Sequence, residues 1–201
     1  MILDVNKFLL TPMIMLGNRN MEYDFCMQVI QSPQGYCMEF GVWEGKSINY
    51  MAKKRPDITF YGFDSFEGLP EDWNMGNKLE GKGHFKVDKI PEVEKNVILV
   101  KGWFDNSIKD WKKNHKDPIQ FLNIDSDLYS SARTILFELN DQIKVNTLIR
   151  FDDLLTSPIA PYPNWRDGEW KALCEWCNEY NREVVPLARS WKQGCTILVK
   201  Q

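Results

Sequence analysis

The stretch YCMEFGVWEG, residues 36–45, joins an apolar run of strand length to a turn that contains two glycines. A helical pattern starts at Lys46, directly after this turn. A strand that enters a helix through a glycine turn is typical of an open parallel α/β sheet, where ligands bind beyond the carboxyl ends of the strands. Free N–H groups at the helix start suit such a ligand. The spacing departs from GxGxxG, so a purely structural turn stays an alternative.

Three further acidic segments follow along the chain, each directly after an apolar run. They contain Asp64, then Asp125 with Asp127, then Asp152 with Asp153. Because the carboxyl ends of parallel strands meet at one edge of a sheet, we expect all four acidic segments to border a single site.

Alternating strand and helix patterns predict an α/β, Rossmann-like three-layer sandwich with a mostly parallel, seven-stranded sheet. We expect one domain over residues 1–201, with an N-terminal arm and helix at 1–33 and a lid loop at 68–91. The first helix is expected over 21–31, stopped by Ser-Pro-Gln-Gly at 32–35. A short connection makes the last two strands an antiparallel hairpin. The expected strands are 36–42, 59–63, 96–100, 119–124, 146–151, 184–188 and 195–200.

Composition excludes several classes of function. The net charge of −3 argues against nucleic-acid binding, and no apolar run is long enough to span a bilayer. The chain shows no signal peptide pattern, and its five Cys are expected to be reduced thiols, so we expect a cytoplasmic protein. The N-terminal arm and the aromatic loop near Trp165 are candidate contacts of a homodimer.

Asp64 lies 25 residues after Glu39, at the end of the next expected strand. A carboxylate there can accept hydrogen bonds from both hydroxyls of a ribose, as in dinucleotide-binding folds. The plainer alternative is that Asp64 is a turn or helix-capping residue. Together with the glycine turn, the spacing favours the ribose role.

The later acidic segments bring Asp125, Asp127, Asp152 and Asp153 to the ends of neighbouring strands. Neighbouring strands lie about 5 Å apart, and clustered carboxylates repel unless a cation or proton neutralises them. Oxygen ligands without His or Cys suit a hard ion such as Mg²⁺. Alternatively, Asp127 only caps the helix at Tyr129 and Asp153 only the following turn.

Several of these motifs resemble the macrocin O-methyltransferase family, class I S-adenosylmethionine-dependent enzymes of which several act on sugar hydroxyls of natural products. The run Asp-Ser-Phe-Glu-Gly-Leu-Pro at 64–70 is the most specific of them. The resemblance covers about residues 36–200. The motifs are EFGVWEG (39–45), FDSFEGLPE (63–71), GKGHF (81–85), VKGWF (100–104), IDSDLY (124–129) and FDD (151–153). The later segments PNW (163–165), GE (168–169) and KA (171–172) also resemble the family.

The resemblance implies roles for individual residues. Glu39, Gly41 and Gly45 would frame the methionine part of the cofactor, and Asp64 would hold the ribose. Ser65 and Phe66 would lie beside the adenosine, and Gly102 and Trp103 would border the adenine. Asp125, Asp152 and Asp153 would bind Mg²⁺, with Asp125 also next to the cofactor, and Asp127 would be the general base for the acceptor hydroxyl.

The chain departs from better-known members of the family in two regions. It has no long N-terminal extension, and its loop 154–165 is its own. Both regions would shape the acceptor pocket, so the acceptor does not carry over from the family. The alternatives are an NAD or nucleotide-sugar enzyme, a non-catalytic cofactor-binding protein, and methylation of a phenol or an amine.

Overall fold

A computed structural model describes residues 3–30 and 35–201. The first two residues of the expected arm, the end of the expected first helix at residue 31 and most of its stop signal at 32–35 lie outside the described residues.

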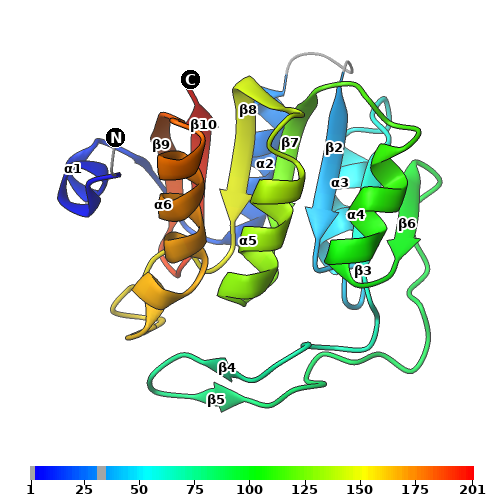
Figure 1. Cartoon of the computed structure of the whole chain (residues 1–201), viewed down its shortest axis with the longest axis horizontal. Coiled ribbons are helices and arrows are strands. Elements are labelled where there is room, and N and C mark those ends of the chain that lie inside the picture. Colours follow the sequence, from blue (N-terminus) through cyan, green and yellow to red (C-terminus); the bar gives the residue numbers. More distant parts are fainter. Residues whose placement is uncertain (1–2, 31–34) are drawn as a thin grey trace.

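An eight-stranded sheet forms the centre of the molecule, in the order β1-β9-β10-β8-β7-β2-β3-β6 (Figure 1). Strand β10 is antiparallel to β8 and β9, and every other pair in the sheet is parallel. The mostly parallel α/β sheet with a C-terminal antiparallel hairpin is therefore confirmed. The strands are β1 (Ile14–Leu16), β2 (Tyr36–Phe40), β3 (Phe60–Asp64), β6 (Val97–Lys101), β7 (Ile119–Ile124), β8 (Ile143–Phe151), β9 (Val184–Ser190) and β10 (Cys195–Val199).

The expected number of seven strands was wrong, because the N-terminal arm supplies an eighth. Strand β1 pairs in parallel with β9, with Ile14 opposite Ala188 and Leu16 opposite Ser190. Ile14 and Met15 are exposed and only Leu16 is buried. Three residues with this burial carry no alternating apolar signal, so only the pairing with β9 reveals the strand.

Two layers of helices cover the sheet (Figure 1). Helices α2 (Arg19–Val29) and α3 (Lys46–Lys54) lie on one face. The other face carries α4 (Phe104–Lys112), α5 (Tyr129–Glu138) and α6 (Glu169–Glu179), which a short 3-10 helix (Trp165–Asp167) precedes. Helix α1 (Val5–Leu10) packs against α6 through the rings of Phe8 and Trp170, whose centroids lie 4.9 Å apart.

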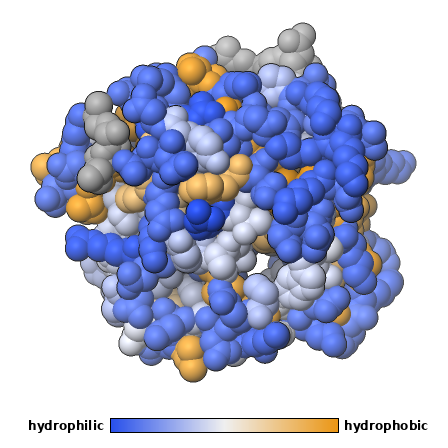
Figure 2. Space-filling view, viewed as in Figure 1, coloured by the Kyte–Doolittle hydropathy of each residue, from blue (hydrophilic) through white to orange (hydrophobic). Residues whose placement is uncertain are grey.

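The surface agrees with this layering. The face in Figure 2 is mostly hydrophilic with scattered apolar side chains, while the core lies between the sheet and its helices. Within the described residues, no helix is long and apolar enough to cross a membrane. All five cysteines are free thiols.

The long loop 68–91 folds into a two-stranded hairpin, β4 (Trp73–Asn74) with β5 (Leu79–Glu80). In Figure 1 this hairpin lies beyond the carboxyl ends of the central strands. It is bonded to the loop 154–165, because Asn77 Nδ2 donates to the Pro161 carbonyl at 3.0 Å and the Asn164 N–H donates to the Met75 carbonyl at 3.1 Å. The loops 68–91 and 154–165 are thus bonded to each other.

Candidate active site

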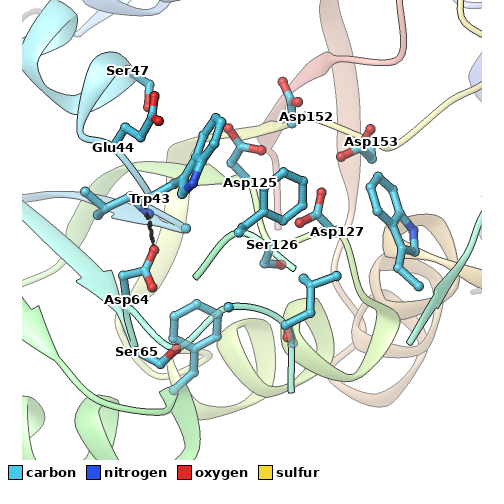
Figure 3. Close-up of a pocket in the computed structure, with 18 of the residues that line it drawn as sticks. Trp43, Glu44, Ser47, Asp64, Ser65, Asp125, Ser126, Asp127, Asp152 and Asp153 are labelled. Atoms are coloured by element: carbon cyan, nitrogen blue, oxygen red, sulfur yellow. Dashed lines mark hydrogen bonds between the residues drawn. The ribbon is translucent and has the colours of Figure 1, made fainter. Parts of the chain in front are cut away.

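A cavity of about 1080 Å³ opens at the carboxyl ends of the central strands (Figure 3). At one end it is bordered by the glycine turn after β2 and by the end of β3, and at the other by the acidic ends of β7 and β8. The 68–91 loop contributes Leu69, Trp73 and Phe85 to the wall, and the β9–β10 turn contributes Lys192 and Gln193. All four acidic segments therefore border one cavity.

Gly41 joins the two ends of this cavity. Its φ is +93°, and a Cβ atom there would lie 1.8 Å from the carbonyl oxygen of Asp125. The Gly41 N–H donates to the Phe63 carbonyl at 3.0 Å, and the Asp125 N–H donates to the Phe40 carbonyl at 2.9 Å. Only glycine permits this approach, so the turn after β2 rests directly on the end of β7.

The carboxylate of Asp64 organises the glycine turn. Its Oδ2 accepts hydrogen bonds from the N–H groups of Val42 and Trp43, both at 2.8 Å, and its Oδ1 accepts from the Phe66 N–H at 2.6 Å (Figure 3). The alternative that Asp64 is a turn residue thus has a structural basis. Since Asp64 also lines the cavity, the ribose role stays a prediction that is compatible with this geometry.

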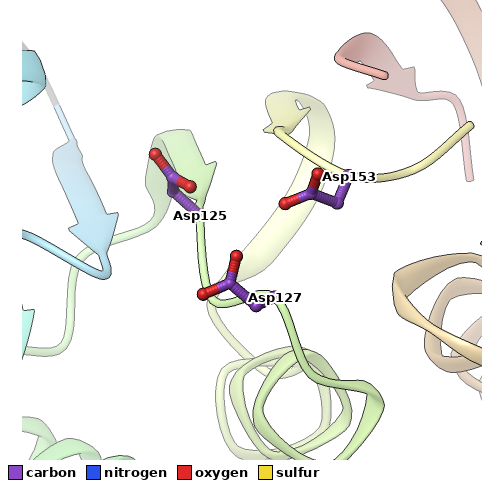
Figure 4. Close-up of side chains that lie close together, drawn as sticks. All are labelled: Asp125, Asp127 and Asp153. Atoms are coloured by element: carbon purple, nitrogen blue, oxygen red, sulfur yellow. The ribbon is translucent and has the colours of Figure 1, made fainter. Parts of the chain in front are cut away.

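At the other end, Asp125, Asp127 and Asp153 place carboxylate oxygens within 4.8 Å of one another, and we call these three residues the acid cluster. Figure 4 shows the three side chains directed at a common centre. Asp127 has a φ of +61° and makes no capping hydrogen bond to α5. Burial, and then the neighbouring Asp152, raise the pKa of Asp125 to about 7. Burial, followed by the charge of neighbouring acidic side chains, raises the pKa of Asp127 and of Asp153 well above the usual range.

Asp152 lies next to this trio but has other partners. Arg150 Nη2 donates to its Oδ1 at 2.6 Å, and the Arg19 guanidinium bonds its Oδ2. Burial favours the protonated form, but the two arginines outweigh it and lower the pKa of Asp152. Of the three expected metal ligands, the structure thus brings Asp125 and Asp153 together with Asp127. Asp152 differs because Arg150, two residues earlier in the same segment, and Arg19 of α2 lie beside it, which the FDD motif does not reveal.

The residues expected to contact the cofactor fall into two groups. Those that line the cavity are Gly41, Asp64, Ser65, Trp103 and Asp125, and those outside its wall are Glu39, Gly45, Phe66 and Gly102.

Glu39 has no exposed surface. Ser47 Oγ donates to its Oε1 at 2.8 Å and Asn123 Nδ2 to its Oε2 at 2.9 Å. Burial, followed by the charge of Asp125, raises the pKa of Glu39 to about 8. Glu39 therefore lies beneath the cavity, on the side of the sheet covered by α3.

Two residues near the acid cluster escaped the analysis of motifs. Arg19 opens α2 and forms ion pairs with Asp125, at 3.5 Å, and Asp152. It stands in a segment without a recognisable pattern. Glu169 is fully buried, and its Oε2 accepts the Asp153 N–H at 3.0 Å. Burial raises the pKa of Glu169 well above its usual range. Its place in the Gly-Glu pair at 168–169, which the family resemblance includes, was the one available signal.

Comparison with known proteins identifies the family. The sequence model described as macrocin-O-methyltransferase (TylF) matches residues 9–162. The chain belongs to the macrocin-O-methyltransferase family. This enzyme therefore transfers a methyl group to an oxygen atom. The match starts well before residue 36, where the motifs begin, and ends before α6 and the C-terminal hairpin.

Solved structures share the fold of this O-methyltransferase at low sequence identity. The calicheamicin methyltransferase CalS11 has a TM-score of 0.70 and 20% identity over 89% of this chain and 77% of its own. The O-methyltransferase NovP has a TM-score of 0.63 and 20% identity, over 91% of this chain and 80% of its own. TomG from Streptomyces achromogenes, in complex with SAM, has a TM-score of 0.56 and 12% identity over 90% and 79% of the two chains. No curated protein sequence matches the chain.

Proposed function

We propose that the protein transfers the methyl group of S-adenosylmethionine to a hydroxyl group of a sugar or another small natural-product-like acceptor, with Mg²⁺ at the acid cluster. The observation that carries the proposal is the cavity itself. One end offers a glycine turn and Asp64, and the other offers Asp125, Asp127 and Asp153. CalS11, described as a TDP-rhamnose 3'-O-methyltransferase, supports a sugar acceptor. TomG, solved with SAM, supports the cofactor.

The cofactor end has the parts that an adenosyl ligand needs. Asp64 would accept a hydrogen bond from the ribose at Oδ1, because this oxygen binds only the Phe66 N–H and keeps a free lone pair, whereas Oδ2 already accepts two backbone N–H groups. Trp103 and Ser65 would border the adenosine, and Gly41 would border the methionine part of the ligand. S-adenosylmethionine supplies an activated methyl group on a sulfonium.

The acid end fits a divalent cation. Its donors are all carboxylate oxygens, and three of them lie within 4.8 Å of one another. Burial, followed by the charge of neighbouring carboxylates, raises their pKa values, and a bound cation would offset both effects. Asp125 and Asp153 would hold Mg²⁺, and Asp152 would join them or remain paired with Arg19 and Arg150. A bound Mg²⁺ would lower the pKa of an acceptor hydroxyl.

Asp127 is the candidate general base. It lines the cavity beside Asp125 and Asp153, just before helix α5, where an acceptor hydroxyl would lie. Its carboxylate would take the hydroxyl proton as the oxygen bonds to the methyl carbon and the carbon–sulfur bond breaks. The aromatic side chains of Trp43, Trp73 and Phe85 would exclude water from this step, and the 68–91 loop that carries two of them would act as the lid.

A thermal-shift panel tests the assignment. S-adenosylmethionine, S-adenosylhomocysteine, NAD, NADP and a nucleotide sugar are each added with Mg²⁺ or with EDTA. A ligand that binds only the folded state raises the melting temperature. We expect stabilisation by the two adenosyl ligands and a further shift with Mg²⁺. Stabilisation by NAD or NADP alone would contradict the proposed cofactor.

The acid cluster is tested separately by Asp125→Asn. This substitution removes one charge from the cation site but leaves the glycine turn in place. We expect methyl transfer to fall by about 100-fold or more, with S-adenosylhomocysteine affinity within about twofold of the wild type. An Asp125→Asn protein with full activity would refute the role of the acid cluster.

A further inference from the structure

Three charged or polar residues form a continuous row across the sheet, one pleat beneath the cavity. Glu39 on β2 is paired in register with Asn123 on β7, and Asn123 with Arg150 on β8. All three have no exposed surface and do not line the cavity. Residues in register on neighbouring strands share a face of the sheet, so these side chains meet. We call Glu39, Asn123 and Arg150 the buried row.

Hydrogen bonds join the buried row from end to end. Asn123 Nδ2 donates to Glu39 Oε2 at 2.9 Å, and Arg150 Nη1 donates to Asn123 Oδ1 at 2.9 Å. The amide of Asn123 thus bonds a carboxyl group on one side and a guanidinium on the other. Such a central residue must both donate and accept, which an amide does and a carboxylate does not.

Both ends of the buried row reach the cavity wall or its supports. Ser47 of α3, which lines the cavity, donates to Glu39 Oε1 at 2.8 Å. At the other end, Arg150 Nη2 donates to Asp152 Oδ1 at 2.6 Å and to Glu22 Oε2 of α2 at 3.0 Å. The network therefore runs from the helix after the glycine turn to Asp152, which lies next to the acid cluster.

The register also places the buried row directly under site residues. Two residues after Glu39, Asn123 and Arg150 come Gly41, Asp125 and Asp152, in that order. Positions two apart in a strand lie on the same face, about 7 Å apart. The backbone ladder continues to this level, since the Asp125 N–H donates to the Phe40 carbonyl and the Asp152 N–H to the Ile124 carbonyl, both at 2.9 Å.

We propose that Asn123 and Arg150 are positioning residues that hold the cofactor turn and the acid cluster in one register through Glu39. The inference rests on the proposed function, because it concerns the binding of an adenosyl cofactor and a divalent cation. It gives Glu39 a role beneath the site in place of direct contact with the cofactor. A single substitution at Asn123 should therefore weaken the binding of both the cofactor and the cation, although Asn123 lines neither end of the cavity.

The main test is Asn123→Leu, which keeps the side-chain size and removes both hydrogen bonds. The dissociation constants of S-adenosylhomocysteine and, separately, of Mn²⁺ are measured by calorimetry well below the melting temperature of each variant. We expect both affinities to fall by about tenfold, the range found for residues that orient ligand-binding groups. Unchanged affinities, or loss of one affinity alone, would overturn the inference.

Gln142→Leu is the matched control. Gln142 is also a buried amide, and it donates to the carbonyls of His115 and Asp117 at 3.1 and 2.9 Å. It directly precedes β8, at the end of the sheet opposite the cavity. We expect a lower melting temperature but both dissociation constants within twofold of the wild type. Equal losses of affinity in this control would reduce the Asn123 effect to general destabilisation and overturn the inference.

If Asn123→Leu does not fold, exchanging the amide and carboxyl groups of Asn123 and Glu39 tests the same inference. Asn123→Asp removes the amide donor to Glu39 and sets two acidic side chains against each other, so both ligands should bind more weakly. Adding Glu39→Gln restores an amide donor to the pair, while the carboxylate introduced at position 123 still accepts from Arg150. We expect recovery of both affinities in the double variant, and no recovery would overturn the inference. Wild-type protein that binds neither ligand would instead refute the proposed function.

Discussion

The two ends of the cavity treat their carboxylates in opposite ways. At the cofactor end, Asp64 receives three backbone N–H groups at 2.6–2.8 Å. At the acid end, Asp125, Asp127 and Asp153 converge within 4.8 Å, and burial raises their pKa values. The hydrogen bonds at the first end complete a folded turn, while the second end crowds buried carboxyl groups together and gains most from a cation. Substitutions at one end should therefore change the binding of one ligand and leave the binding of the other unchanged.

The largest effect is expected where the two ends touch. Gly41→Ala puts a Cβ atom 1.8 Å from the Asp125 carbonyl oxygen at a φ of +93°. We expect a loss of about 3 kcal/mol or more in the free energy of unfolding, measured by urea titration. Gly83→Ala is the control, because its φ is +83° but no atom lies within 4 Å of the added Cβ. It should cost only about 1 kcal/mol, and equal losses would show that the contact is irrelevant.

Asp153→Asn should affect the acid end alone. Asp153 is buried and belongs to the carboxylate trio, so losing its charge should weaken Mn²⁺ binding by about tenfold or more. S-adenosylhomocysteine should bind within twofold of the wild type. Calorimetry of both ligands checks this, and an equal loss of cofactor affinity would argue that the ends are not separate.

Asp64→Asn should show the converse. An amide nitrogen then faces at least one of the N–H groups of Val42, Trp43 or Phe66. Leaving a donor unpaired costs about 1–3 kcal/mol, so S-adenosylhomocysteine affinity should fall by about tenfold. Mn²⁺ affinity should stay within twofold. Unchanged cofactor affinity would leave Asp64 with a purely structural role.

The pH dependence of stability should sharpen the contrast. In the folded protein Asp125 keeps its proton up to a pKa of about 7, against an ordinary value of 3.8. Between these values the folded state holds more protons than the unfolded chain, so stability falls as pH rises. Urea titrations in EDTA should show a weaker fall from pH 4 to 7 in Asp125→Asn than in the wild type. Identical slopes would contradict the raised pKa.

The smallest effect is expected for Arg19→Gln. The side chain of Arg19 is 53% exposed, so solvent screens its ion pairs with Asp125 and Asp152. Removing this competing charge should tighten Mn²⁺ binding by about threefold. Lys46→Gln is the control at the cofactor end, where Lys46 pairs with Glu44 at 2.5 Å. Weaker Mn²⁺ binding in Arg19→Gln would indicate that Arg19 supports the cation site.

Much of this architecture could be predicted because its signals are local. Apolar runs marked seven of the eight strands, and the acids after them marked the edge where the cavity lies. The pattern also predicted the antiparallel hairpin of β9 and β10. Strand β1 escaped because its residues are mostly exposed and its stability comes from β9, more than 160 residues away in the chain.

The sequence did not reveal which carboxylates converge and which pair with arginine. Asp152 and Asp153 are neighbours in one motif, yet Asp152 pairs with Arg150 and Arg19 while Asp153 joins Asp125 and Asp127. Adjacent residues at a strand end point in different directions, and apart from Arg150 their partners come from other elements. The burial of Glu39 under the cavity likewise depends on Asn123 and Ser47.

The sequence by itself therefore determined the α/β order, the carboxyl edge that carries the site and the family of the enzyme. These depend on hydrophobic periodicity and on motifs within single segments. Only the tertiary structure decided which carboxylates converge, which are neutralised by arginine and which lie beneath the cavity. The physical reason is that charge and hydrogen bonding depend on the register between strands, which brings together residues distant in the chain.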